Sequence, residues 1–264
     1  MRNSTIPTKL LRPQWDLAMD PSVHPIASSL KAQAKYFNYL IIGPRISPLN
    51  SSLLRQRAAR LGILLVCVGL LAFTIDVPIA LLTSTHPLPK EISNILRLSE
   101  IGGHGTGAAM ILIAALAIKQ LNWRKKRDRL IACQLIAGSY LGALIVDLLK
   151  LTINRVRPHS ALLNLRTSFL DTFGQELLKP DSVSRSALMS FPSGHAAVAA
   201  GLAVSLCWFY PRGRSVFIAL AILASFQRIN SLSHFLSDIC IGAAIGIAGA
   251  LVFAPAPNHA DRGQ

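Results

Sequence analysis

The stretch QRINSLSHFLSD contains Arg228, then His234, then Asp238 four residues later. On a helix this spacing puts His234 and Asp238 on one face, so the carboxylate can accept a hydrogen bond from one imidazole nitrogen. The other nitrogen is then free to act as a nucleophile. The alternative is a buried ion pair that only fixes helix packing. An aspartate in a membrane segment is costly without a partner, so both interpretations require the two side chains to meet.

A second set of chemically useful residues lies in FPSGHA, before a run of small apolar residues. Pro192 suits the first turn of a helix, while Ser193 and Gly194 can present a hydroxyl and open backbone N–H groups to an anion. His195 projects from the same turn. The alternative is an ordinary helix cap beside a histidine that has no role.

A third set is KLTINRVRP, in which Arg157 follows Lys150 by seven residues. Seven residues are about two helical turns, so the two cations share a face if the helix continues as far as Pro158. Two cations placed in this way suit an anion with several oxygens. The alternative is a lysine and an arginine that reach from a helix end to the membrane surface.

Membrane helices must position these residues, because 52% of the 264 residues are hydrophobic and only 15% are charged. A helix needs roughly 20 apolar residues to cross the hydrocarbon of a bilayer. We therefore predict an all-α, polytopic membrane helix bundle of six helices, with five as the alternative because the fourth and fifth are short. The predicted spans are residues 61–82, 103–121, 130–150, 195–210, 215–231 and 235–254.

The basic residues predict the orientation of this bundle. Residues 1–60 carry nine Lys and Arg, the loop 122–129 carries five, and the turn 211–214 carries two. All three segments fall on one side of a six-span topology, and the positive-inside rule makes that side the cytoplasm. The three motifs then meet at the opposite, extracytoplasmic face.

The same topology divides the chain into three parts. Residues 1–60 are predicted to be a basic, flexible cytoplasmic extension, either disordered or with a short helix on the membrane surface. Residues 61–254 form the six-helix domain, and residues 255–264 form a short cytoplasmic tail.

Three motifs carry a family resemblance: K-x6-RP at 150–158, PSGH at 192–195 and R-x5-H-x3-D at 228–238. In this order they resemble the membrane-embedded type 2 phosphatidic acid phosphatases, whose superfamily includes the vanadium haloperoxidases. The resemblance covers roughly residues 61–254. It implies a phosphoric monoester hydrolase that acts on a lipid phosphate or pyrophosphate at the outer membrane face, without a metal or other cofactor. Gln227 departs from the family's usual serine, which affects the fine geometry of the phosphate site.

The resemblance also implies a role for each motif residue. His234, oriented by Asp238, would attack phosphorus and form a phosphohistidine. His195 would protonate the leaving group and then activate water. The residues that would bind the phosphate oxygens are Lys150, Arg157, Ser193, Gly194 and Arg228.

Two acidic residues have predicted structural roles. Asp76 lies inside the first predicted span, where it either pairs with a cation such as Lys150 or Arg157 or makes a polar contact between helices; we favour a structural role. Asp147 precedes Lys150 by three residues and is predicted to be its partner within one helix.

Other residues are assigned only by their position near the motifs. His104 in GGHGTG is a candidate substrate contact, although such glycines more often permit close helix packing. His159 is a candidate for the rim of the site, and Glu100 for a contact with lipid headgroups. The four cysteines fall in apolar runs without metal-ligand spacing, which predicts buried, inert thiols.

Several other functions are less favoured by the sequence. The net charge of +15 is not arranged as a basic stripe with interleaved aromatics, so nucleic acid is not an expected partner. A lipid phosphotransferase with the same site stays open, because acceptor choice depends on the loop 159–190. A haloperoxidase has no obvious use for six spans, and a transporter would carry its charges at the membrane midplane rather than near one face. The sequence does not fix which phosphorylated lipid is the substrate, or the oligomeric state.

Overall fold

The computed structural model of this chain describes residues 48–118, 121–182 and 184–254. Most of the predicted N-terminal extension and all of the predicted tail lie outside these residues. Residues 48–60, which we assigned to the extension, instead form the first part of a helix. The helical domain therefore begins earlier in the chain than its apolar composition indicates.

Within the described ranges the regular structure is helical, with only isolated backbone bridges and no strands. This confirms the predicted all-α fold with candidate membrane helices. A short 3-10 segment, η2 (Glu100–Gly103), joins two of the helices. The α-helices are α2 (Pro48–Ala72), α3 (Asp76–Thr85), α4 (Lys90–Ser99), α5 (Gly105–Ile118), α6 (Lys126–Leu149), α7 (Gly194–Phe209), α8 (Arg214–Asn230) and α9 (Leu236–Val252).

Four of the predicted spans correspond to α6, α7, α8 and α9, within a few residues at each end. The first predicted span, 61–82, is wrong as a single helix, because α2 ends at Ala72 and α3 runs at 77° to it. Pro78 explains the break, since a continuous helix would place its ring against the carbonyl four residues earlier. The second span is also preceded by a bend, of 70°, between the α4–η2 segment and α5.

Length and composition limit which helices can cross a membrane alone. In the described part of the chain, only α6 passes such a test by itself, and up to three spans result if each bent pair counts as one. Helices α7 and α9 are apolar but have 16 and 17 residues. At 1.5 Å per residue they are about 24–26 Å long, slightly less than a typical hydrocarbon core. The count of six spans stays a prediction.

The surface of the helical domain is rich in exposed apolar side chains, as a lipid environment requires. Large apolar residues are exposed along α2, α5, α6 and α8. The four cysteines are free, but Cys67 and Cys133 lie on this exposed surface, so the prediction of buried thiols holds only for Cys207 and Cys240.

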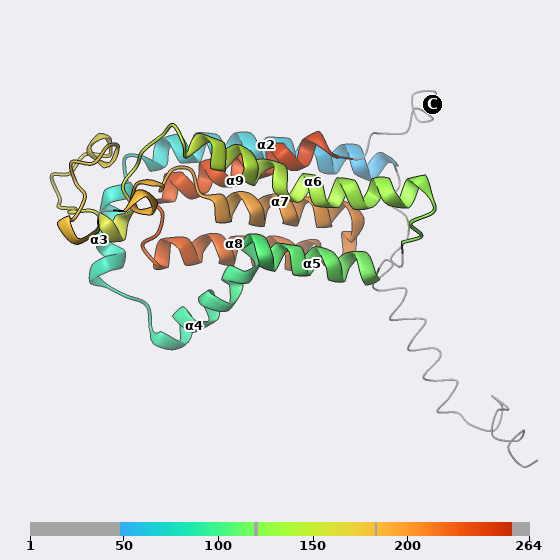
Figure 1. Cartoon of the computed structure of the whole chain (residues 1–264), viewed down its shortest axis with the longest axis horizontal. Coiled ribbons are helices and arrows are strands. Elements are labelled where there is room, and N and C mark those ends of the chain that lie inside the picture. The colour runs from blue at the N-terminus through green and yellow to red at the C-terminus, as the bar shows by residue number, and fades with distance from the viewer. Residues whose placement is uncertain (1–47, 119–120, 183, 255–264) are drawn as a thin grey trace, which may run out of the picture. The chain divides into compact units, whose positions relative to one another are not determined.

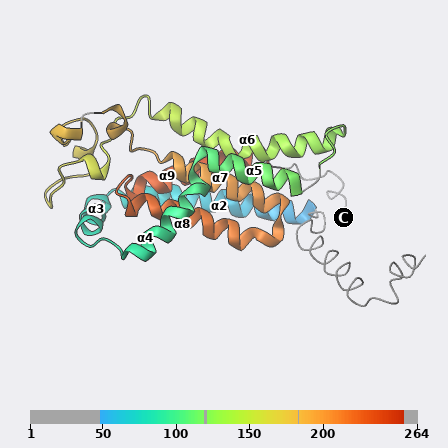
Figure 2. The same cartoon turned by 60° about the horizontal axis from the view of Figure 1, so that its bottom comes forward.

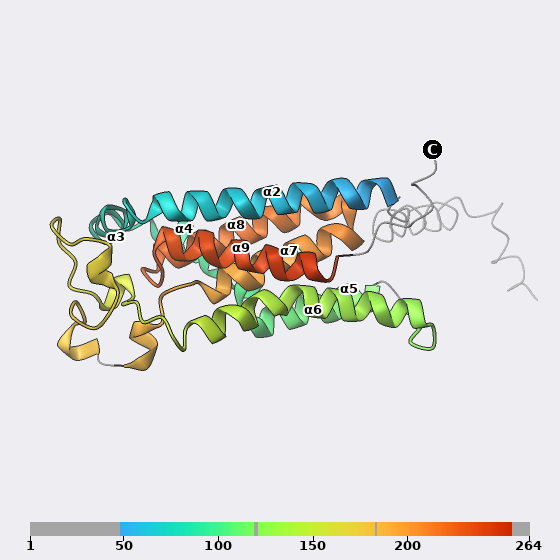
Figure 3. The same cartoon turned by 90° about the horizontal axis from the view of Figure 1, so that it is seen from above.

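Helix α9 lies at the centre of the helix packing, in contact with α2, α6 and α7 (Figure 3). Helix α8 packs against α7, and α4 packs against α8. The α2–α3 bend, the long connection 150–193 and the α8–α9 turn lie together at one end of the helices (Figure 1), and a rotated view agrees (Figure 2). The three motifs therefore lie at that end of the helices.

Glycines let α6, α7 and α9 approach closely enough for backbones to touch. A Cβ added to Gly246 of α9 would lie 2.9 Å from the backbone carbon of Ala197 in α7. One added to Gly242 would lie 3.0 Å from the backbone nitrogen of Ser193. Small residues are the usual means of close helix packing in membranes, and here they hold the first turn of α7 against α9.

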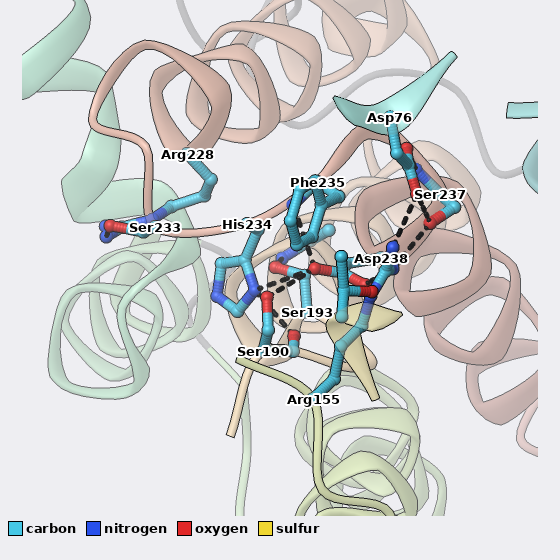
Figure 4. A network of polar contacts seen from close by, with 12 residues as sticks. Asp76, Arg155, Ser190, Ser193, Arg228, Ser233, His234, Phe235, Ser237 and Asp238 are labelled. Carbon is cyan, nitrogen blue, oxygen red and sulfur yellow. Dashed lines mark hydrogen bonds and ion pairs between the residues drawn. The ribbon is translucent and has the colours of Figure 1, made fainter. Parts of the chain in front are cut away.

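A buried ionic cluster beneath this end fixes the α2–α3 bend, the long connection and α9 together (Figure 4). The fully buried Arg155 donates from Nη2 to Asp76 Oδ2 at 2.8 Å and from Nη1 to Asp238 Oδ1 at 2.5 Å. Its Nε donates to Thr172 Oγ1 at 3.0 Å. Asp76 also accepts from the backbone nitrogen of Ser237 at 3.0 Å. Asp76 thus has the expected structural role, with Arg155 as its cation instead of Lys150 or Arg157.

Aromatic rings complete the surroundings of this arginine. The guanidinium carbon of Arg155 lies 4.2 Å from the centre of the Phe235 ring, 4.9 Å from that of Phe173 and 5.2 Å from that of Phe73. Rings attract a cation through their electron-rich faces and exclude water from it. The side chains of the cluster are thus withdrawn from the surface, and each of its charges depends on the others.

Replacing Gly246 tests the close packing of α7 on α9. We expect Gly246→Ala to lower the thermal midpoint in detergent, because overpacking costs about 1–3 kcal/mol where backbones cannot separate. Gly105→Ala is the matched control, since a Cβ there meets nothing within 4 Å. Equal midpoints for the two variants would contradict the packing argument.

Replacing Arg155 tests the buried cluster. Arg155→Met leaves Asp76 and Asp238 buried without their cation, so we expect a loss of about 3–5 kcal/mol of stability, seen as a large drop in thermal midpoint. Arg166→Met is the control, because Arg166 is exposed on the same connection. A midpoint unchanged by Arg155→Met would show that the carboxylates do not need this arginine.

Candidate functional site

The three motifs come together at one end of the helices through backbone and side-chain contacts. The backbone nitrogen of Ser193 donates to the Asp238 carbonyl at 2.9 Å, which joins the second motif to the third. The ammonium of Lys150 lies 3.1 Å from the point where a Cβ on Gly194 would stand, which joins the first motif to the second. A glycine at position 194 therefore leaves the space that this ammonium occupies.

His234 lies in the turn between α8 and α9, not on a helix, and its side chain is buried. Its Nδ1 is 2.7 Å from the backbone carbonyl oxygen of Ser190. A carbonyl can only accept, so Nδ1 carries the proton and Nε2 keeps its lone pair. Burial lowers the pKa of His234, with nearby Asp238 opposing that shift, so the ring is favoured in its neutral, nucleophilic form.

The predicted direct hydrogen bond from His234 to Asp238 is wrong. The distance from His234 Nδ1 to Asp238 Oδ2 is 3.7 Å, too long for a hydrogen bond. Asp238 Oδ2 instead accepts from Ser190 Oγ at 2.6 Å and from the backbone nitrogen of Phe235 at 2.8 Å. Asp238 acts on the histidine through Ser190, whose carbonyl orients the ring (Figure 4).

His195 lies in the first turn of α7, as predicted, with its side chain 28% exposed. Its Nε2 is buried without a hydrogen-bond partner among the described residues, and lies 3.7 Å from Glu100 Oε1. The ring of His104 stands edge-on to that of His195, with centroids 5.6 Å apart. His104, a weak candidate from the sequence, is therefore close to the site.

Arg228 has a partner that the sequence did not reveal. Its Nη1 forms a hydrogen-bonded ion pair with Glu100, and its Nη2 donates to Ser233 Oγ at 2.8 Å. Its Nε is buried without a partner in the described part of the chain. We expected Glu100 to contact lipid headgroups, and nothing in the spacing links residues 100 and 228. Only the packing of α4 and η2 on α8 brings them together.

The other two cations come from the C-cap of α6 and from the non-helical connection that follows it. Helix α6 ends at Leu149, so the condition for a shared helix face of Lys150 and Arg157, a helix that continues to Pro158, is not met. Asp147 lies 3.6 Å from Lys150, the C-cap residue of α6, which confirms the predicted pairing. Burial and the charge of Arg228 lower the pKa of Arg157, whose Nε is buried without a partner among the described residues.

Ser193 and its neighbours serve the helix as well as the site. The fully buried Ser193 is the N-cap of α7, and its Oγ accepts from the backbone nitrogen of Ala196 at 3.4 Å. Ser193 thus has the helix-capping role that was the alternative to anion binding. His159 is exposed, and its backbone nitrogen and Nδ1 both lie 2.9 Å from the Leu232 carbonyl oxygen. Gln227 is buried, and its Oε1 has no partner in the described chain.

The assembled side chains suit the chemistry of an anion with several oxygens. The three cations lie near the two histidines, and Arg157 and Arg228 each have a buried Nε without a partner in the described part of the chain. Such preorganised donors stabilise developing negative charge without having to reorient. Among the residues that the structure describes, no group of three or more His, Cys, Asp and Glu is placed to hold a metal ion.

Comparison with known proteins agrees with this arrangement. A family model described as the PAP2 superfamily matches residues 131–261, a range that contains all three motifs. The lipid A 1-phosphatase of Rhizobium etli is 28% identical over 192 residues, which cover 68% of this chain and 75% of that protein. The lipid A 1-phosphatase of Rhizobium johnstonii is 29% identical over 196 residues, 68% of this chain and 73% of that protein. No solved structure matches the chain.

The family resemblance of the three motifs is thus confirmed independently. The match covers most of α6, the long connection and α7 to α9, which carry the three motifs, whereas Glu100 and His104 lie before it. Over residues 131–261 the chain is similar to the PAP2 superfamily, and the comparisons support a lipid phosphatase of the membrane, a phosphoric monoester hydrolase.

Proposed function

We propose that this protein removes the phosphate from a phosphorylated lipid at the outer membrane face through a phosphohistidine, without a metal. The observation that carries the proposal is the contact between His234 Nδ1 and the Ser190 carbonyl. It keeps the ring proton on Nδ1 and leaves Nε2 unprotonated as the nucleophile. Lowering of the His234 pKa by burial supports the same assignment.

The proposed reaction has two steps. In the first, Nε2 of His234 attacks phosphorus, and the bond from phosphorus to the ester oxygen breaks as His195 gives that oxygen a proton. In the second, His195 takes a proton from water, the water oxygen attacks phosphorus, and the bond from phosphorus to His234 breaks. The products are a dephosphorylated lipid and inorganic phosphate.

The cations supply the electrostatic part of this proposal. Lys150, Arg157 and Arg228 would bind the phosphate oxygens, with the Gly194 backbone and the N-terminus of α7 nearby. Among the described residues, the buried Nε atoms of Arg157 and Arg228 have no partner, which supports this role. With this much charge from side chains, the reaction needs no metal to neutralise the phosphate.

An apolar pocket supports a substrate with a hydrocarbon part. It has a volume of about 310 Å³ and lies between η2, α5, α7 and α8. Ala199, Leu202 and Leu206 line it from α7, and they follow His195 on the same helix face. Because two relatives bear the name lipid A 1-phosphatase, the 1-phosphate of lipid A is our first candidate substrate. The motifs lie at the end opposite the basic loops, which supports an active site on the extracytoplasmic face.

Substitution of the two histidines tests the catalytic assignment. We expect purified wild-type protein to release inorganic phosphate from lipid A in detergent with EDTA present. His234→Ala should lose activity at least about a thousandfold, as nucleophile variants do. His195→Ala should lose about 100- to 10,000-fold, as expected for a general acid and base. His86→Ala, in an exposed histidine after α3, is the control and should behave as wild type.

The panel of substrates in this assay separates the parts of the proposal. Phosphatidic acid, phosphatidylglycerol phosphate and a polyprenyl pyrophosphate are tested beside lipid A. Release from another lipid alone would contradict the substrate but keep the mechanism. Loss of activity in EDTA, restored by a metal, would contradict metal independence. Transfer of phosphate to an added lipid acceptor without release would favour a phosphotransferase.

Trapping the intermediate tests the identity of the nucleophile. We expect wild-type protein quenched in alkali during turnover of a radiolabelled lipid phosphate to retain label that acid removes, because a phosphoramidate bond is stable in alkali and labile in acid. His234→Ala should retain none. Label that survives acid, or label on His234→Ala, would rule out a phosphohistidine at this residue.

A further inference from the structure

Glu100 occupies the point where two groups of the site converge. Its Oε1 forms the ion pair with Arg228 Nη1 and also lies 3.7 Å from His195 Nε2. In the proposed reaction Arg228 binds a phosphate oxygen, and His195 protonates the ester oxygen. One carboxylate oxygen therefore stands where oxygens of the substrate would stand.

The backbone of η2 holds Glu100 in this place. A Cβ on Gly103 would lie 3.1 Å from the His195 carbonyl oxygen, so η2 packs directly on the first turn of α7. Helix α4, which leads into η2, packs on α8, the helix that carries Arg228. The contacts of η2 with α7 and of α4 with α8 thus hold the Glu100 carboxylate at the site. Its side chain is 32% exposed, so the carboxylate can move away into solvent.

The other acidic residues near the motifs are engaged elsewhere. Asp76 and Asp238 are bound to the buried Arg155. Asp147 pairs with Lys150 at the edge of the site and is 71% exposed. Among the described residues, Glu100 is therefore the acidic side chain that offsets the positive charge of Arg228 when no phosphate is bound.

We propose that Glu100 is the resting counter-ion of the phosphate site, which every phosphate must displace from Arg228 in order to bind. This rests on the proposed function in one respect, that Arg228 binds the substrate phosphate. An anion without a hydrocarbon part, such as inorganic phosphate, then competes poorly with the tethered carboxylate. A lipid phosphate competes well because its hydrocarbon part adds binding energy. Glu100 would thereby select membrane-anchored phosphates and speed release of the product.

The test compares Glu100→Gln with Glu91→Gln, a matched loss of one carboxylate at the exposed start of α4. Inhibition of lipid hydrolysis by inorganic phosphate is measured in detergent. We expect Glu100→Gln to lower the inhibition constant about tenfold, since a partly exposed charged hydrogen bond is removed from Arg228, and to lower KM. Glu91→Gln should change neither. Glu100→Asp, whose shorter side chain reaches Arg228 less well, should fall between wild type and Glu100→Gln.

Three outcomes would overturn the inference. One is an inhibition constant that Glu100→Gln leaves unchanged. Another is a fall in kcat as large as that of His195→Ala at constant phosphate inhibition, which would make Glu100 part of proton transfer. The third is an equal effect of Glu91→Gln, which would make the change a distant charge effect.

A binding measurement separates this inference from the proposed function. The concentration of inorganic phosphate that raises the thermal midpoint is measured for the same variants without any lipid. If wild type hydrolyses no lipid but Glu100→Gln responds to about tenfold less phosphate, the proposed function fails and the counter-ion role stands. If hydrolysis proceeds as proposed and the phosphate response of Glu100→Gln equals that of wild type, only the counter-ion role fails.

Discussion

The ion pairs of Arg155 with Asp76 and Asp238 are the constraint on which the site depends. They join residues 79 and 83 positions apart in the chain, and all three side chains are withdrawn from solvent. A buried charge is tolerated only when it is paired and hydrogen-bonded, so the α2–α3 bend, the long connection and α9 have one arrangement in which all three charges are satisfied. That arrangement fixes the position of Asp238. Asp238 in turn positions Ser190, whose carbonyl orients His234.

The fully buried Asp238 offsets part of the repulsion among the cations at this end of the helices. Its charge acts favourably on Lys150 and Arg157, which repel each other. This attraction keeps the two cations close together where burial strengthens their repulsion. Arg228, which repels Arg157, is paired instead with the carboxylate of Glu100 from η2.

Local patterns were sufficient to predict much of this architecture. The apolar segments at α6 to α9 are bounded by charges or prolines, so their ends follow from composition. The motif residues could also be named, because each motif is only a few residues long. Contacts between distant segments could not be read in this way. The partners Arg155, Ser190 and Glu100 lie in stretches without periodicity, and the predicted contact between His234 and Asp238 assumed a helix that in fact begins two residues after the histidine.

The acceptor that orients His234 is the main-chain carbonyl of residue 190, and this has a genetic consequence. Every amino acid supplies the same carbonyl, so no single codon change at that position deletes the acceptor itself. A peptide carbonyl also has no proton to lose or gain near neutral pH, which keeps the tautomer of the imidazole the same from one acidity to another. Substitutions at residue 190 can therefore change the orientation of His234 only if they move the backbone there.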